Sequence, residues 1–279
     1  TLVWALLIAL ALGYQFQLQN RFRRDWEIVR STLWELKTRA PDLEPGTTLL
    51  IDRMMVDSLT DNSLNALVNW LYEDPDELAR EVIKVFEVDN RREMLLNDDP
   101  ARPFTHNAFT GMLADAIFAV KTPSGCLTIL RPGDRFMPSL SKGGKALLAR
   151  GAEPSERILP TVSRPMETPD WLGSEPDENW CALYERAELA ADRGDWESVL
   201  AEAEKADEMG FEPVSAVEYR SFFVAALIAD DLERAERYAS AILAEEGVPA
   251  YAAAQLDGLT LSSGADAIAA RVRDEAERR

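Results

Sequence analysis

A continuous apolar run at the start of the chain constrains its fold more than any other feature. Only Gly13 interrupts a run of thirteen residues from Leu2 to Tyr14, and polar residues follow at once. An α-helix needs roughly 20 apolar residues to span a bilayer. Because the chain begins inside this run, we expect residues 1–19 to be the end of a transmembrane helix that starts further upstream in a longer membrane protein.

A signal peptide is the alternative interpretation of this run, because its apolar core has a similar length. A signal peptide also needs a basic segment in front and a cleavage site of small residues, and Ala11-Leu12-Gly13 is a poor match to such a site. Arg21, Arg23 and Arg24 follow the run and, by the positive-inside rule, favour a cytoplasmic remainder. The sequence thus predicts a cell-membrane protein with a single visible span.

The charge balance excludes several classes of function. The 279 residues include 49 acidic and 30 basic side chains, so the formal net charge is −19. Nucleic acids and anionic lipid surfaces require a positive patch, and we therefore expect neither as a partner. One histidine and two cysteines are too few for a structural zinc site, and a catalytic triad would need His106 as its base. Cys126 and Cys181 either pair or remain buried thiols.

The middle of the chain, residues 20–160, reads as an α/β soluble domain. Apolar residues at helical spacing and short apolar runs between turn residues indicate a small sheet with flanking helices. Expected helices cover residues 25–38, a segment from residue 61, 77–86 and 145–150, and expected strands cover residues 47–51, 118–120 and 126–130. Prolines and polar residues then predict a linker over residues 161–179, within a wider stretch from 151.

Asp61, Asn62 and Ser63 form the best candidate binding constellation in this domain. Asp61 with Asp57, or Asp98 with Asp99, also has the form of a carboxylate pair for acid–base catalysis. Acidic residues at helix starts are favoured for capping alone, and this is the simpler interpretation. We therefore predict no catalytic residue, no metal and no cofactor. Residues 142–145 resemble a phosphate loop but lack its first glycine and its Ser/Thr, so we reject that function.

An internal period marks the last third, residues 180–279. The stretch from Arg193 to Val199 has a counterpart 36 residues later, and a fainter copy begins at Gly264. Alanine-rich helical patterns flank each copy. This region resembles tetratricopeptide repeats through Gly194-Asp195-Trp196 and its alanines, although Asp230 replaces the turn glycine in the second copy. The resemblance implies stacked helix pairs that bind a protein partner.

Several short phrases carry a wider resemblance: Asp25-Trp26, residues 39–47, Asp61-Asn62-Ser63-Leu64, Asn69-Trp70 and Gly194-Asp195-Trp196. Through these the chain resembles the C-terminal end of bacterial polytopic membrane proteins that are similar in layout to lipid-sugar-dependent glycosyltransferases. That resemblance implies an extracytoplasmic soluble part, in conflict with the arginines after the apolar run. Our leading hypothesis is a membrane-tethered module for protein–protein interaction or scaffolding, non-catalytic by itself. The alternative is a soluble glycosyltransferase domain that contributes to substrate binding, with Asp61 near the substrate.

Overall fold

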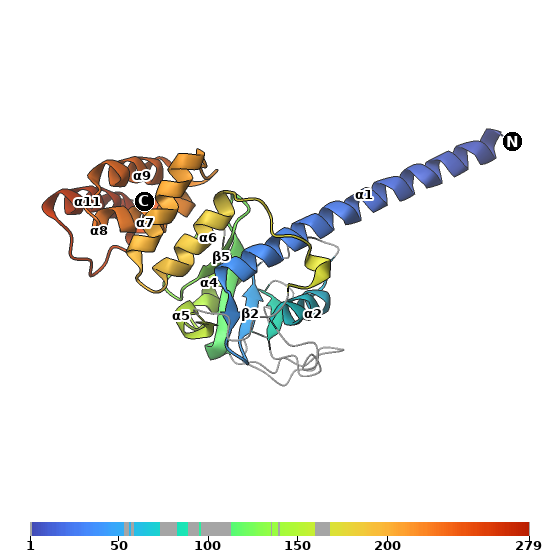
Figure 1. The fold of residues 1–279 in the computed structure, drawn as a ribbon, viewed down its shortest axis with the longest axis horizontal. Helices are drawn as coiled ribbons and strands as arrows, with labels where there is room; N and C mark the ends of the chain where they lie inside the picture. Colours follow the sequence, from blue (N-terminus) through green and yellow to red (C-terminus); the bar gives the residue numbers. More distant parts are fainter. Residues whose placement is uncertain are drawn as a thin grey trace.

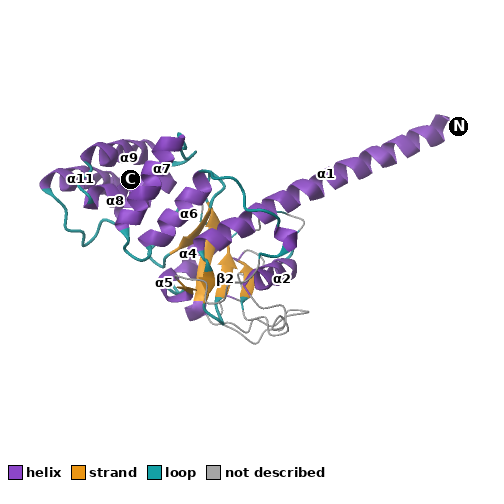
Figure 2. Ribbon diagram, viewed as in Figure 1, coloured by secondary structure: helices purple, strands orange, loops and turns teal. Residues whose placement is uncertain are grey.

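The chain is mostly helical, with two small sheets (Figures 1 and 2). The computed structural model describes residues 2–52, 56, 59–72, 83–88, 95, 113–134, 136–138, 140–159 and 168–278. The α-helices are α1 Leu2–Arg39, α2 Asp61–Tyr72, α4 Lys142–Leu148, α5 Pro154–Arg157, α6 Trp180–Ala191, α7 Trp196–Met209, α8 Arg220–Ile228, α9 Leu232–Ala244, α10 Val248–Ala253 and α11 Ser263–Arg278. The strands are β1 Asp42–Leu43, β2 Thr48–Ile51, β3 Lys84–Glu87, β4 Ala116–Lys121, β5 Leu127–Leu130 and β6 Ile158–Leu159.

Helix α1 is one unbroken rod that projects from the body of the molecule (Figure 1). Its 38 residues make it about 57 Å long at 1.5 Å per residue. It is long and apolar enough to cross a bilayer, and its most apolar 18-residue window is 0% buried. The other end packs into the body through Val29, Leu33 and Leu36. The predicted boundary after residue 19 and the separately predicted helix 25–38 therefore both fall inside α1.

The larger sheet has the strand order β3-β2-β4-β5. Strand β2 is parallel to both β3 and β4, whereas β5 returns antiparallel to β4. A turn at residues 123–125 joins β4 to β5, and Gly125 has the positive φ of 88° that favours glycine there. A short pair of strands, β1 with β6, lies apart from this sheet. The small sheet that the sequence predicted is thus present.

The two faces of the sheet pack against different helices, because side chains alternate along each strand. On β4, Ile117 and Ala119 face the cluster that contains the buried side of α1 and of α2. Phe118 and Val120 face the opposite cluster, which continues without a break into the helices after residue 180. The sheet is therefore the middle layer of a three-layer arrangement, and the C-terminal helices share its core.

Helices α6 to α11 form an all-helical array in which successive helices pack in pairs: α6 with α7, α8 with α9, and α10 with α11. The first two pairs have the same turn. Gly194 and Asp230 both have positive φ, 70° and 58°, and Asp230 is the one non-glycine residue with positive φ in the described part of the chain. The next residue, Asp195 or Asp231, caps the following helix with its side chain. Asp230 thus adopts the conformation of the glycine that it replaces.

The third copy differs from the prediction. Gly264 lies inside α11, because that helix begins earlier, at Ser263. Ser262 replaces the aspartate cap, and its hydroxyl accepts a hydrogen bond from the Ala265 amide at 3.2 Å. The Ser262 hydroxyl also lies 2.5 Å from Asp230 Oδ1, which links the second turn to the third helix pair.

Two predicted elements differ from the structure in the middle of the chain. Residues 84–86, predicted as helix, belong to strand β3, while residues 77–82 lie outside the described residues. Helical spacing of Leu78, Val82 and Val85 misled the prediction, because a strand buried on both faces is also apolar throughout. In the predicted linker 161–179, residues 168–179 are described, and Leu172 is buried among the side chains packed on α1.

Candidate functional site

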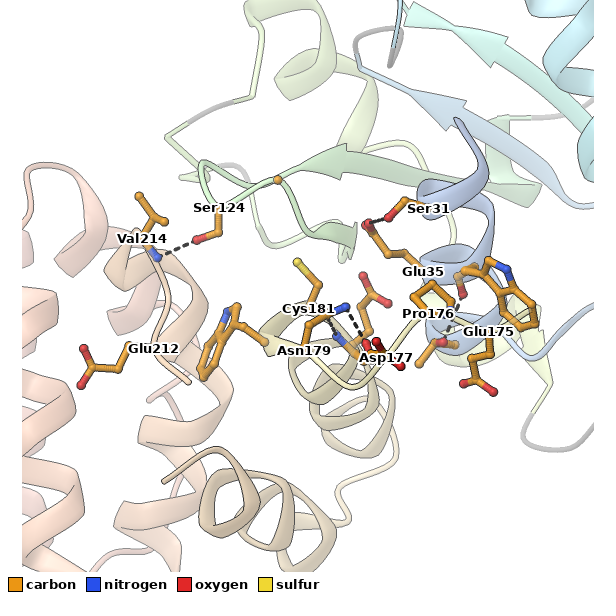
Figure 3. A pocket seen from close by; sticks show the side chains of 16 residues that line it. Ser31, Glu35, Ser124, Glu175, Pro176, Asp177, Asn179, Cys181, Glu212 and Val214 are labelled. Atoms are coloured by element: carbon orange, nitrogen blue, oxygen red, sulfur yellow. Dashed lines mark hydrogen bonds between the residues drawn. The ribbon is translucent and has the colours of Figure 1, made fainter. Parts of the chain in front are cut away.

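A cavity of about 410 Å³ lies where α1, the β4–β5 turn and the start of the helical array meet (Figure 3). We call it the junction cavity. Its walls come from four stretches that are distant in sequence, so it exists only in the folded chain. The lining residues are, on α1, Ser31, Trp34, Glu35 and Thr38; in the turn, Ser124 and Gly125; before α6, Glu175, Pro176, Asp177 and Asn179; on α6, Trp180, Cys181, Ala182 and Glu185; and after α7, Glu212 and Val214.

The lining of the junction cavity is strongly acidic. Its five ionisable residues are all carboxylic acids, namely Glu35, Glu175, Asp177, Glu185 and Glu212, and no lysine or arginine occurs among the described residues that line it. Two indole rings, Trp34 and Trp180, complete the walls. Carboxylates raise the affinity of a cavity for cations, and the faces of aromatic rings do the same.

Glu185 is the deepest of the five acids. Its side chain is 0% exposed, and neither carboxyl oxygen has a hydrogen-bond partner. Burial raises the pKa of Glu185 well above its ordinary value, and the neighbouring Glu35 carboxyl raises it further. Lys121 and the Leu127 amide oppose this rise without reversing it. Burial therefore favours the neutral, protonated form of Glu185 in the free protein.

Glu35 is also a carboxylic acid, but unlike Glu185 it has hydrogen-bond donors around it. Its Oε2 accepts a hydrogen bond from the Leu127 amide at 2.8 Å and pairs with the Lys121 ammonium, while Ser31 donates to Oε1 at 3.1 Å. These donors hold the Glu35 carboxylate against the β4–β5 turn. Of the two adjacent acids, one is thus satisfied and the other is not.

A second hollow of about 600 Å³ adjoins the junction cavity along α1 toward its exposed half. The two hollows share Ser31, Glu35 and Gly125. Arg24 and Lys121 line the second hollow together with Glu27 and Glu35, so the charges of its lining balance, whereas the lining of the junction cavity is acidic. Glu35 stands at the boundary.

A separate group of six charged residues crosses the core between the sheet and the array. This ionic network consists of Arg39, Arg131, Asp134, Glu188, Asp192 and Arg220. The three arginines balance the three carboxylates. Arg220 donates to Asp134 at 2.5 Å and to Glu188 at 3.2 Å, and the Tyr251 ring lies 4.1 Å from its guanidinium.

Asp192 is the second centre of the ionic network. Arg131 donates to its Oδ1 through Nε at 2.9 Å and through Nη2 at 2.6 Å, and Arg39 pairs with its Oδ2. Burial alone would raise the pKa of Asp192, but the two guanidiniums overcome this effect and lower it. Nε and Nη1 of Arg39 have no hydrogen-bond partner. The ionic network joins the end of α1, the loop after β5, α6 and α8, and it is charge-balanced, as a structural link requires.

One disulfide, Cys126–Cys181, joins the beginning of β5 to the first turn of α6. The sequence left open whether Cys126 and Cys181 pair or remain thiols, and in the structure they pair. Cys181 lines the junction cavity, and Cys126 is fully buried. The indole of Trp180, the residue before Cys181, donates a hydrogen bond to the buried Glu218 carboxylate at 2.5 Å. The disulfide and this bond fix the wall that α6 contributes.

The predicted binding residues lie elsewhere. Asp61 occupies the first turn of α2 and is buried, whereas Asn62 and Ser63 are exposed. Thr60 supplies the cap, because its Oγ1 accepts the Ser63 amide at 3.4 Å. None of the three predicted residues lines either hollow. Asp57, Asp98, Asp99 and His106 lie outside the described residues, and the described ones contain no group of three His, Cys, Asp or Glu able to hold a metal.

The structure explains Gly144, within residues 142–145, without a phosphate ligand. Residues 142–145 form the first turn of α4, and Ser141 caps that turn by accepting the Gly144 amide at 3.0 Å. A Cβ on Gly144 would lie 2.3 Å from Asp52 Oδ1. The glycine therefore makes room for a buried carboxylate, which would repel a phosphate.

The sequence did not identify Glu35 or Glu185, the two acids at the centre of the cavity. Both lie on amphipathic helices, where a glutamate normally faces solvent. The sequence contained one signal for Glu185. It stands among the apolar residues Leu183, Tyr184 and Ala187, and the structure buries all three. Searches with this chain against protein-family models, curated proteins and solved structures found no match. The site must therefore be interpreted from its own geometry.

Proposed function

We propose that this chain is a membrane-anchored binding module, non-catalytic by itself, that recognises a partner at the junction cavity and the adjoining helical array. The junction cavity carries the proposal. It lies where the anchor helix, the sheet and the array meet, and a cavity of several hundred Å³ with a few convergent polar groups is the usual form of a binding site.

The finer description of the array is a tetratricopeptide-like repeat. Its support is the shared turn at Gly194 and Asp230, with the aspartate cap that follows each. Buried alanines at the helix crossings, such as Ala203 and Ala239, also fit that packing. Helix pairs of this kind commonly present protein-binding surfaces.

The proposed location is the cell membrane, with the body of the molecule on the extracytoplasmic side. Disulfides persist in oxidising compartments and are rare in the cytosol, so Cys126–Cys181 supports that side. Arg21, Arg23 and Arg24 favour the opposite side by the positive-inside rule, so this assignment rests on the disulfide. An exposed cysteine introduced at Glu204 tests this. A membrane-impermeant maleimide should label it in intact cells, and labelling only after lysis would contradict the assignment.

Site-specific photocrosslinking tests partner binding. A photoreactive residue at Val214, which is 84% exposed at the cavity rim, should yield a specific adduct in cells. The same residue at Glu197, exposed on α7 away from the cavity, is the matched control. Equal adducts at both positions, or no adduct at Val214, would contradict the proposal.

Removal of the whole array is a less suitable test, because the array is part of the fold. Tyr184 of α6 donates a hydrogen bond to Thr128 of β5, and Asp192, just after α6, accepts one from Arg131 in the loop after β5. A truncation before α6 would therefore expose one face of the sheet and break the ionic network. Loss of binding would then report loss of folding.

The glycosyltransferase alternative stays a second proposal. It assigns a role near the substrate to Asp61, and Asp61→Asn is its test. Unchanged transfer activity with an unchanged amount of protein would remove the reason for keeping it.

A further inference from the structure

We infer that the junction cavity binds an alkylammonium group, which ionises Glu185 and forms its ion pair there. The inference rests on the proposed function only in taking this cavity as the recognition site. A free polyamine and a lysine side chain of a protein partner carry the same group.

The first argument concerns the donors that Glu185 lacks. A carboxyl that is 0% exposed and has no hydrogen-bond partner is costly to bury. Most buried polar groups are hydrogen-bonded, so an exception that faces a cavity calls for an explanation. Glu185 lines the junction cavity, and a ligand with N–H donors would supply the bonds that the protein does not.

The second argument concerns the sign of the charge around it. Glu175, Asp177 and Glu212 are exposed at the cavity mouth, while Glu35 and Glu185 lie deeper. Such a gradient draws a cation inward. Trp34 and Trp180 also line the cavity, and aromatic rings favour an organic cation over a hydrated inorganic one.

The third argument concerns the shape of the cation. The carboxylates come from different elements: Glu35 from α1, Glu185 from α6 and Glu175 from the segment between residues 173 and 179. An ammonium has three N–H donors in a tetrahedral arrangement and can reach acceptors from several directions, whereas the planar guanidinium fork suits one carboxylate. Lys121 already pairs with Glu35, which shows that an ammonium is accommodated next to this acid pair.

Binding must then release a proton. Burial favours the protonated form of Glu185 in the free protein, and the ion pair needs the charged form, so the proton of Glu185 leaves to solvent as the ammonium enters. The groups that face Glu185 are the Glu35 carboxyl on α1, the Lys121 ammonium on β4 and the Leu127 amide on β5. A bound ammonium adds a positive charge to this set and favours the ionised form.

Isothermal titration calorimetry on the full chain in a non-ionic detergent, at 150 mM NaCl and pH 7, tests the inference. Spermidine is the first probe. The second is the peptide acetyl-Ala-Lys-Ala-amide, with its Nε-acetylated form as the neutral control. Titrations in two buffers of different ionisation enthalpy count the protons released. We expect saturable binding with release of about one proton per site.

Glu185→Gln keeps the size of the side chain and removes the charge, so it should weaken binding roughly 30-fold or more and abolish proton release. Glu204→Gln makes the same substitution on an exposed face of α7 and should bind like wild type. Binding of spermidine alone would identify a free polyamine, and binding of the lysine peptide would identify a partner side chain.

Three results would overturn the inference: no saturable binding of either amine, equal binding of the acetylated peptide, or equal loss in the two glutamate variants. Anchoring and photocrosslinking do not depend on these titrations. A negative result here would therefore leave the proposed function standing, with a different ligand chemistry.

Discussion

The ionic network and the Glu35–Glu185 pair are both buried groups of charged side chains, yet they differ in composition. Each carboxylate of the network meets at least one guanidinium, and Asp192 meets two. Glu185 lies beside another carboxyl, and neither of its own carboxyl oxygens has a hydrogen-bond partner. Both groups are built partly on α6, so the same helix supplies a satisfied acid and an unsatisfied one. Burial alone therefore does not distinguish a structural charge from a functional one, whereas the balance of donors does.

The largest effect is expected at the centre of the ionic network. Arg220→Met leaves Asp134 and Glu188 buried without their guanidinium and should lower the free energy of unfolding by about 3–5 kcal/mol. Urea denaturation followed by circular dichroism measures this. Arg237→Met removes an exposed arginine that pairs with Asp207, and its expected cost is below about 1 kcal/mol. Similar costs for both variants would show that the network is not a structural link.

The second-largest effect is expected at the disulfide that joins the sheet to the helical array. Replacing Cys126 and Cys181 together by alanine should lower the free energy of unfolding by about 2–4 kcal/mol, because the cross-link restricts the unfolded chain. Reduction of the wild-type chain should reproduce the effect and leave the double variant unchanged. If the reductant destabilises the double variant equally, the disulfide is not its target.

Glu185→Gln should act in the opposite direction. The pKa of Glu185 is raised in the folded state, so its contribution to stability is complete below the ordinary glutamate pKa and is lost as pH rises through the folded value. Glutamine resembles the protonated acid and removes that loss. The free energy of unfolding of the variant should equal that of wild type near pH 4 and exceed it by about 1–3 kcal/mol at high pH.

Asp192 provides the contrast in pH dependence. Its pKa is lowered, so its contribution is present above the ordinary aspartate pKa and is lost as pH falls through the folded value. Denaturation of wild type and Glu185→Gln between pH 3 and 9 separates the loss of stability at alkaline pH, due to Glu185, from the loss at acid pH, due to Asp192. A difference between these two chains that grows toward acid instead of alkali would reverse the assignment of the two acids.

The smallest effect is expected at the cavity mouth. Glu212→Gln removes an exposed carboxylate and should weaken spermidine binding only a few-fold, by about 0.2–1 kcal/mol, with less effect at high salt. Calorimetry at two salt concentrations measures this. A loss as large as that of Glu185→Gln, independent of salt, would move the recognition site from the floor of the cavity to its rim.

Much of the local structure could be predicted from the sequence, because periodicity and turn residues are local. Apolar runs gave β2, β4 and β5, and the Gly194-Asp195 pattern gave the turn of the first helix pair. Strand β3 was missed because Val85 continued an apparently helical spacing. The limits of α1 were missed because polar residues after Tyr14 suggested a break that the backbone does not have.

The site could not be predicted, because its chemistry arises from contacts distant in sequence. Arg39 and Asp192 are 153 residues apart, and no local pattern pairs them. Glu35 and Glu185 look like ordinary solvent-facing residues of their helices until the sheet brings α1 and α6 together. The sequence candidates at residues 61–63 were chosen for their local polarity, which burial and hydrogen bonding can satisfy without any ligand.

The protonation state of Glu185 tests the central claim most directly. Infrared difference spectroscopy of wild type against Glu185→Gln at pH 7 isolates the carboxyl signal of this residue. The claim predicts the band of a protonated carboxylic acid in the free chain and its replacement by carboxylate bands when spermidine is added. An ionised Glu185 in the free chain, or a protonated band that saturating spermidine leaves unchanged, would contradict it.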